Sequence, residues 1–281
     1  MAEMMIGGDL KQTSKDQASA FGDIVFETRK LCQPKRGDFG TALKDICLTV
    51  RKGEIFGIAG VAGNGQNELF LALSGEQLCN DKDAVCIGAQ SVGDWSITKR
   101  RTLGLCAVPE ERNGHAAVVD FTLTDNAVLS ARGRMQLVRL GLIRYRSAAD
   151  YARKIIEKFK VKATGCQAHA GSLSGGNLQK YIVGREIMQS PDVLLIAQPT
   201  WGVDAGAAAA IHQALLDLAA QGSAIIVISQ DLDELLGVCD RLCVINEGAL
   251  SQSLKVGEAS IEQIGLLMGG GAVMEEKTDA N

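Results

Sequence analysis

A glycine-rich turn in the first quarter of the chain has the residue types of a phosphate-binding loop. It reads Gly60-Val61-Ala62-Gly63-Asn64-Gly65-Gln66-Asn67. It lies between an apolar run and a helical pattern, where consecutive backbone N–H groups converge on an anion at the helix N-terminus. The spacing matches the P-loop, in which lysine and a Mg²⁺-binding hydroxyl follow the last glycine. Gln66 and Asn67 stand in those two places, and a tight strand-to-helix turn is the alternative reading. The candidate phosphate-binding residues are Gly60, Gly63, Asn64, Gly65, Gln66 and Asn67.

A second anion-binding turn is predicted where Leu173 is followed by a serine and two glycines. A serine with glycines at a helix start leaves N–H groups free to meet an anion. Simple helix capping is the alternative reading. The candidate residues are Ser174, Gly175, Gly176 and Asn177.

Four further positions are candidates only because the motifs of the chain, taken together, resemble those of a known family. Ala197 and Gln198 follow Leu194-Leu195-Ile196, Gln230 follows Ile228-Ser229, and Glu110 follows Pro109. Neutral Gln198 can orient water but is a very weak base, and alanine has no side chain that could bind a cation.

The elements that position these motifs are predicted to form a mostly parallel sheet. Continuous apolar runs separated by helical patterns are typical of parallel strands covered on both faces. An antiparallel flank is expected within residues 20–58, and a mostly helical stretch over residues 120–190. In that stretch Ser147 and Asp150 resemble an N-cap box, and an apolar stripe follows them. The predicted parallel strands cover residues 54–59, 104–108, 192–197, 223–229 and 242–245.

Taken in order, these motifs resemble the nucleotide-binding domains of ABC transporters over about residues 20–270. The string at 173–177 is similar to the family's signature motif, and the string at 194–204 to Walker B followed by the D-loop. The phrases GVAGNGQNEL, PEERNG and SLSGGNLQK resemble most the second half of double-length ATPase subunits that serve simple-sugar and nucleoside importers. The resemblance implies an α/β fold, a P-loop NTPase of ABC type with an antiparallel flank and a helical subdomain.

Against the family pattern, five positions have lost the chemistry of ATP hydrolysis. The Walker A lysine and its hydroxyl neighbour are replaced, and so are the Walker B aspartate, the catalytic glutamate and the switch histidine. Phosphoryl transfer depends on positioning and charge neutralisation, so we expect little or no hydrolysis at this chain's own site and no metal there. Glu110 also stands where the Q-loop glutamine is usual. The replaced positions are Gln66, Asn67, Ala197, Gln198 and Gln230.

The signature residues, in contrast, are intact. In this family two domains hold ATP head to tail, and each gives its signature loop to the nucleotide of the other. The resemblance therefore implies ATP shared with a second nucleotide-binding domain, with weak binding at the P-loop and Mg²⁺ only at the partner's site. It further implies membrane permease subunits, a solute-binding protein and a peripheral place on the cytoplasmic face of the membrane.

The ends of the chain read as linkers. We expect residues 1–20 to be the tail of a preceding repeat, 21–270 the nucleotide-binding domain with its helical subdomain at about 112–175, and 271–281 a disordered tail. The segment 3–8 echoes residues 266–270, so the partner domain would be the N-terminal half of the same polypeptide; coincidence is the alternative.

Length, net charge and composition argue against several classes of protein. The chain has 281 residues and a net charge of −4, so nucleic acid is a poor partner. It shows no apolar run long enough to span a bilayer and no signal peptide, and its eight cysteines suggest neither zinc nor disulfides. A soluble ABC-type ATPase and a structural or regulatory domain that binds no nucleotide remain as alternatives.

Three further features are less specific. Trp201 is expected at a dimer interface or over the core, and Phe39 in the core or stacked on adenine. A basic run in the helical region is either a solvated face or a docking site for a membrane subunit or anionic headgroups. Its members are Arg132, Arg134, Arg139, Arg144 and Arg146.

Overall fold

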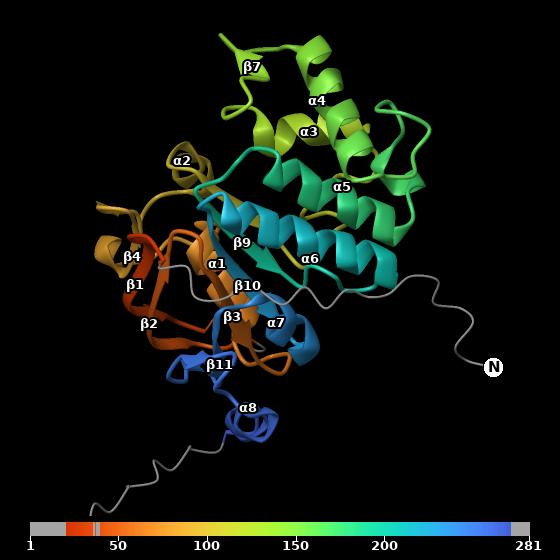
Figure 1. The fold of residues 1–281 in the computed structure, drawn as a ribbon. Coiled ribbons are helices and arrows are strands. Elements are labelled where there is room, and N and C mark those ends of the chain that lie inside the picture. The colour runs from red at the N-terminus through yellow and green to blue at the C-terminus, as the bar shows by residue number, and fades with distance from the viewer. Residues whose placement is uncertain (1–20, 36, 38–39, 271–281) are drawn as a thin grey trace, which may run out of the picture.

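The centre of the molecule is a parallel sheet. The computed structural model describes residues 21–35, 37 and 40–270. Its main sheet has the strand order β12-β11-β3-β10-β9-β6, with β13 also paired to β11 (Figure 1). All five predicted apolar runs form parallel strands of this sheet, which confirms that prediction. The strands are β3 (Ile55–Ala59), β6 (Leu105–Val108), β9 (Val193–Ala197), β10 (Ala224–Ser229) and β11 (Arg241–Asn246), with the short antiparallel β12 (Ala249–Leu250) and β13 (Leu254–Lys255).

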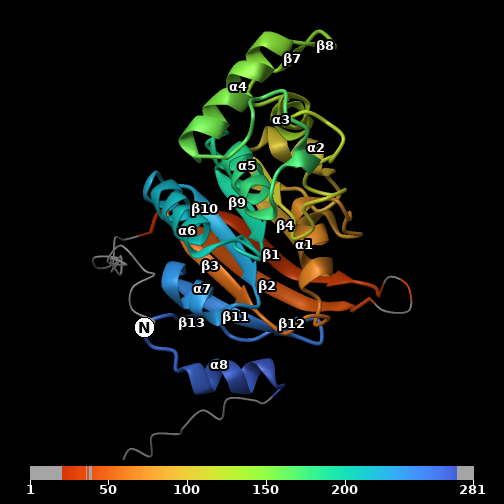
Figure 2. The ribbon, with the colours of Figure 1, turned by 90° about the vertical axis from the view of Figure 1, so that its right-hand side faces the viewer.

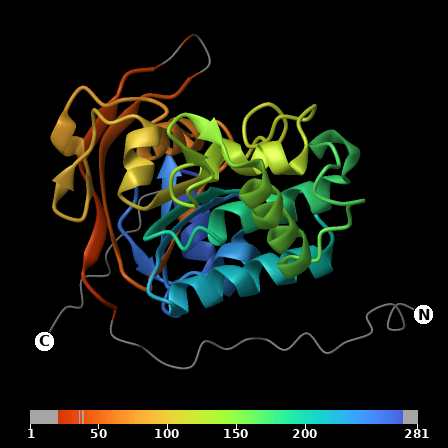
Figure 3. The same cartoon turned by 90° about the horizontal axis from the view of Figure 1, so that it is seen from above.

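An antiparallel sheet flanks the parallel one, as the sequence predicted. Its order is β2-β1-β4-β5, and it forms the outer layer on one side of the molecule (Figure 3). Its two long strands, β1 and β2, alternate buried and exposed residues over part of their length, as expected for strands with one face on a core. The strands are β1 (Ile24–Gln33), β2 (Leu43–Arg51), β4 (Val85–Ile87) and β5 (Gln90–Ser91).

Helices complete the layers on both faces of the parallel sheet. The first helix lies between the two sheets, and α5 and α6 cover the opposite face of the parallel sheet (Figures 1 and 2). The helices are α1 (Gln66–Ser74), α2 (Ile97–Thr102), α3 (Leu123–Ala131), α4 (Tyr145–Lys158), α5 (Gly175–Ile187), α6 (Ala205–Ala220), α7 (Leu232–Val238) and α8 (Ile261–Met268), with short 3₁₀ turns at Lys82–Ala84 and Ala170–Ser172.

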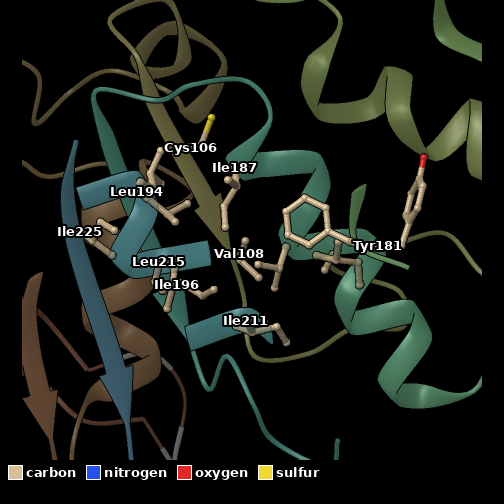
Figure 4. Packing of buried hydrophobic residues seen from close by; sticks show 14 of the residues in the cluster. Cys106, Val108, Tyr181, Ile187, Leu194, Ile196, Ile211, Leu215 and Ile225 are labelled. Carbon is tan, nitrogen blue, oxygen red and sulfur yellow. The ribbon is translucent and has the colours of Figure 1, made fainter. Parts of the chain in front are cut away.

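Successive residues of each parallel strand alternate between two cores. Ile55 and Ala59 face the core between the parallel sheet and helices α5 and α6. Phe56 and Ile58 face the core that the sheet shares with α1 and the antiparallel sheet. Figure 4 shows the first core, where side chains of β6, β9 and β10 meet α5 and α6. Burial of both strand faces explains why these strands read as unbroken apolar runs.

The helical region differs from its prediction in two details. A hairpin of β7 (Val138–Arg139) and β8 (Leu142–Ile143) interrupts it, within a stretch that was expected to be mostly helical. The N-cap box predicted at Ser147 is wrong, because α4 begins earlier, with Arg144 as its N-cap and no side-chain cap. The hairpin closes with Arg144 N–H bonded to the Leu137 carbonyl, and Ala148 N–H already bonds the Arg144 carbonyl, so the helix starts directly after the hairpin.

Both predicted tails, residues 1–20 and 271–281, lie outside the described residues, as do the repeat echo at 3–8 and Phe39. The apolar stripe expected on α4 is confirmed, since Ile155 and Phe159 are buried and Ile156 packs against the same core. No described helix is long and apolar enough to cross a bilayer.

Candidate functional site

The glycine-rich turn joins the end of β3 to the start of α1. Its backbone needs glycine at two places, because Gly63 and Gly65 have φ of 88° and 108°. A third glycine is required by close approach: a Cβ on Gly60 would lie 2.8 Å from the carbonyl oxygen of Ile245 and 2.7 Å from Nε2 of Gln66. The sequence therefore builds the shape of a phosphate-binding loop, with a neighbouring side chain already against its first glycine.

Asn64 fastens this turn to the sheet. Its side-chain oxygen accepts a hydrogen bond from Glu247 N–H at 3.0 Å, and its carbonyl accepts one from Gly248 N–H at 2.9 Å. Thr41 approaches from the antiparallel flank, and its hydroxyl donates to the Gly63 carbonyl at 2.8 Å. The turn is thus held in a loop conformation from two other parts of the molecule.

The Gln66 side chain folds back into the turn. Its Nε2 donates to the Val61 carbonyl at 2.7 Å, and its Oε1 accepts from the backbone N–H of Asn64 at 3.1 Å. One partner is a carbonyl and the other an N–H, so the amide orientation is determined by its bonds. The amide therefore engages one of the backbone donors with which a P-loop binds phosphate.

A cavity of about 440 Å³ lies beside the start of α1. It brings together five of the six positions at which the sequence departs from the family pattern, all except Gln230. Two glutamates line this cavity, and no lysine or arginine does. A phosphate chain there would meet carboxylates in place of cations. The sequence-predicted residues that line it are Gln66, Asn67, Glu110, Ala197 and Gln198, together with Pro109, Glu111, Phe70, His115, Trp201 and Ile228.

Gln198 lies at the end of β9 in a left-handed backbone conformation, with φ of 49°. Its N–H donates to the Ile228 carbonyl at 2.8 Å, which joins it to β10. Its side-chain oxygen lies 3.4 Å from the Ser229 hydroxyl and 3.5 Å from the backbone N–H of Gln230. The two glutamine positions are therefore adjacent, and both side chains are uncharged at every pH.

The signature residues lie at a separate place. Ser174 is the N-cap of α5, and its hydroxyl accepts from Asn177 Nδ2 at 2.8 Å. A second cavity, of about 490 Å³, is lined by Leu173, Gly175 and Leu178 and shares no lining residue with the first. Gly176 leaves room, because a Cβ there would find its nearest neighbour, Val203 Cβ, at 3.7 Å.

Arg112 is a site residue that sequence reasoning did not single out. Its guanidinium donates to the Trp201 carbonyl, and its Nη1 would lie 2.8 Å from a Cβ on Gly175. Partial burial lowers the pKa of the guanidinium. The side chain links the signature loop to the D-loop region at Trp201, which is itself 63% exposed. The sequence analysis named it only as part of the string PEERNG and assigned it no role.

A buried ionic network anchors the helix that begins at the signature loop. Glu186 of α5 accepts hydrogen bonds from Arg101 and Arg185, both at 2.8 Å, and from Ser130 of α3 at 2.5 Å. Burial by itself would raise the pKa of Glu186, but the two arginines and Ser130 outweigh burial and lower it to about 2. Glu186 is therefore ionised and ties α2, α3 and α5 together.

Comparisons with known proteins agree with this geometry. The model of the family described as "ABC transporter" matches residues 43–201, more than half of the chain. This chain belongs to the ABC transporter family. The ABC fold is shown as well by solved ATP-binding cassettes. A nucleotide-free cassette is 21% identical, with a TM-score of 0.67 over 88% of this chain and 96% of the other. A dimeric cassette in a post-hydrolysis state bound to ADP and Pi is 20% identical, with a TM-score of 0.70 over 82% and 98%.

Curated relatives of this ABC transporter chain are about twice as long as the chain. The nucleoside import ATP-binding protein NupA of Lactococcus lactis is 34% identical over 98% of this chain and 54% of its own length. The glucose import ATP-binding protein TsgD13 of Haloferax volcanii is 36% identical over 96% and 49%. The ribose import ATP-binding protein RbsA of Lactococcus lactis is 33% identical over 96% and 53%. This chain spans about half the length of these relatives.

The residues of this site fit ATP better than they fit Mg²⁺. The backbone of the ABC P-loop keeps its glycine shape, but the Gln66 amide engages it. For Mg²⁺ the fit is poor, since Ala197 has no ligand atom and Asn67 has only a neutral amide oxygen. Among the described residues, no group of three or more histidines, cysteines or acids could hold a metal ion.

Proposed function

We propose that this chain is a nucleotide-binding unit of an importer for simple sugars or nucleosides and works as the non-hydrolysing member of a pair. Family membership and the names of the relatives support the transport role. Relatives of about twice its length support a tandem protein. In our proposal this chain is the second half, as the resemblance of its motifs implies, and the other half is the partner. Sugars and nucleosides appear in the names of the relatives, and these names do not identify which solute this chain serves.

The observation that carries the asymmetry is the double hydrogen bond of Gln66 inside its own P-loop. A phosphate that binds this loop must first displace the amide from Asn64 N–H and from the Val61 carbonyl. Each such bond contributes about 1 kcal/mol net, and the amide offers no charge to the phosphate in return. ATP therefore binds weakly at this loop.

Hydrolysis at this site has no support from the surrounding groups. Gln198 can hold a water but takes up no proton, and Ala197 supplies no metal ligand. The two glutamates of the cavity oppose the charge of a triphosphate. Mg²⁺ in our proposal belongs to the partner's site.

The signature loop acts in the partner's site. Ser174, Gly175 and Gly176 open α5, so their N–H groups and the helix dipole favour an anion. That nucleotide is held by the partner's P-loop, and this loop completes its surroundings. Permease subunits at the cytoplasmic face of the membrane, and a solute-binding protein acting through them, complete the proposed assembly.

A titration of this chain with a fluorescent ATP analogue, with and without Mg²⁺, tests the proposal. We expect weak binding that Mg²⁺ does not strengthen, and no turnover. Strong Mg²⁺-dependent binding with ATPase activity that the change Gln198→Ala abolishes would refute it. Complete absence of binding would leave the signature loop as the sole nucleotide contact of this chain.

A further inference from the structure

The β7–β8 hairpin exposes apolar side chains to an unusual degree. Leu140 is 94% exposed, Leu142 74%, Tyr145 59% and Ile143 41%. They lie within six residues, at or beside the tip of a hairpin whose strands pair Arg139 with Leu142. Several large apolar side chains exposed together on one short hairpin mark a candidate interaction site.

The turn at the tip of the hairpin contains a residue type that its backbone conformation disfavours. Leu140 and Gly141 form the two-residue turn with φ of 50° and 78°. Turns of this type favour Asn, Asp or Gly, since a leucine in the left-handed region meets steric strain. Leu140 is both strained and exposed, so neither local geometry nor the core of the domain explains its presence.

Arginines surround the apolar tip. Residues 126–149 contain five arginines and no acidic residue, in a chain whose net charge is −4. Arg134 is engaged by the Gln189 carbonyl and Asp192. Arg139, Arg144 and Arg146 are exposed, and within the described part of the chain no carboxylate pairs with any of the three.

The hairpin projects from one end of the molecule. In Figures 1 and 2 it lies at the top, beyond the first turns of α4 and at the end opposite α8. None of the cavities described above, nor a further one of about 540 Å³ between α2 and α3, is lined by residues 138–146. The tip is therefore a small projection and not the wall of a groove.

We propose that this hairpin tip inserts into the surface of an anionic lipid membrane. The leucines would enter the boundary of the acyl chains, Tyr145 would lie at headgroup level, and Arg139, Arg144 and Arg146 would meet lipid phosphates. A stable protein interface buries roughly 800 Å² on each partner, more than two strands of two residues offer. A bilayer needs no complementary surface, which is why we favour lipid over a protein partner.

Sedimentation of the full chain with vesicles, without nucleotide, tests the proposal independently of the proposed function. Vesicles of equal parts phosphatidylglycerol and phosphatidylcholine should bind the chain, and vesicles of phosphatidylcholine alone should bind it much less. Changing Arg139, Arg144 and Arg146 to glutamine should lower the affinity roughly fivefold per residue on the anionic vesicles. Added salt should have the same effect.

The decisive variant is Leu140→Asn. Asparagine tolerates the left-handed conformation, so the melting temperature should stay the same or rise. Vesicle affinity should nevertheless fall about tenfold, since the apolar side chain that enters the membrane is lost. Leu78→Asn is the matched control, because Leu78 is 50% exposed elsewhere on the surface and its change should leave vesicle binding intact.

A spectroscopic probe reports insertion directly. In Leu140→Trp, the new tryptophan should shift its emission to the blue on anionic vesicles and be quenched by brominated lipid, relative to the wild type with Trp95 and Trp201. Unchanged emission, or Leu140→Asn bound as tightly as wild type, would overturn the proposal. Binding only to vesicles that carry permease subunits, or a dimer that Leu140→Asn dissolves, would overturn it in favour of a protein partner.

Discussion

The P-loop and the signature loop are two glycine-containing turns at helix starts, and their surroundings differ. At the first, Gln66 bonds the loop to itself and the neighbouring cavity carries carboxylates. At the second, Ser174 precedes α5 without a side-chain cap on the helix, and two glycines form its first residues. The two turns differ in backbone as well as in side chains, because Gly65 precedes α1 with φ of 108°, whereas Ser174 precedes α5 with φ of −63°. A glycine turn alone therefore does not show that a nucleotide is held and hydrolysed there.

The largest expected effect concerns the anchoring of α5. Glu186→Gln would leave the guanidinium groups of buried Arg185 and half-buried Arg101 without their counter-charge, which should lower the free energy of unfolding by about 3–5 kcal/mol. Denaturant unfolding measures this change. Glu157→Gln, an exposed residue of α4, should stay within about 0.5 kcal/mol. Equal effects of the two changes would mean that the network does not anchor the signature helix.

The same network predicts an acid transition. The pKa of Glu186 is about 2 in the folded chain and near 4.5 in the unfolded chain. A lowered folded-state pKa gives stability that is fully present above pH 4.5 and is lost as the pH falls toward 2. Unfolding free energy measured across that interval should fall more steeply for the wild type than for Glu186→Gln.

A matched pair of carboxylates compares the two loops directly. Gly176 and Asn67 are each the second residue of their helix, α5 and α1. In the complete transporter Gly176→Asp should reduce ATP turnover more than about a hundredfold, because a negative charge would face the partner's nucleotide. Asn67→Asp should change turnover less than about twofold. If Asn67→Asp were the more harmful, the assignment of the two loops would be reversed.

Removing the amide should improve the weaker loop. Gln66→Ala removes the amide from Asn64 N–H, which then keeps only its longer bond of 3.3 Å to the Val61 carbonyl, so the affinity for an ATP analogue should rise about tenfold. Fluorescence titration provides the measurement. Asn67→Ala serves as control, since it removes the same group one residue later. Weaker binding by Gln66→Ala would show that Gln66 helps to hold phosphate.

The smallest expected effect is that of restoring lysine. Gln66→Lys returns one cation to the loop, but Ala197 and Gln198 still supply neither a metal ligand nor a base. A steady-state ATPase assay of the chain should therefore detect no turnover. Robust activity in this single variant would contradict the account of the site.

Local sequence determined the framework of this protein. Unbroken apolar runs predicted β3, β6, β9, β10 and β11, because strands buried on both faces need apolar residues at every position. Glycines marked the two turns, and positive φ explains Gly63 and Gly65 of the first turn. Local preference failed at the start of α4, where the hairpin before it, and not Ser147, sets the first turn.

Tertiary structure decided which groups meet. Arg112 reaches Trp201, 89 positions along the chain, and Ser130 reaches Glu186 across 56 positions. The hydrogen bonds of the Gln66 side chain also depend on the backbone conformation of its loop. Ile245 of β11 lies against that loop, and the bond from Glu247 N–H to the Asn64 side chain holds it in place. Such contacts depend on the packing of whole elements, and no pattern of neighbouring residues encodes them.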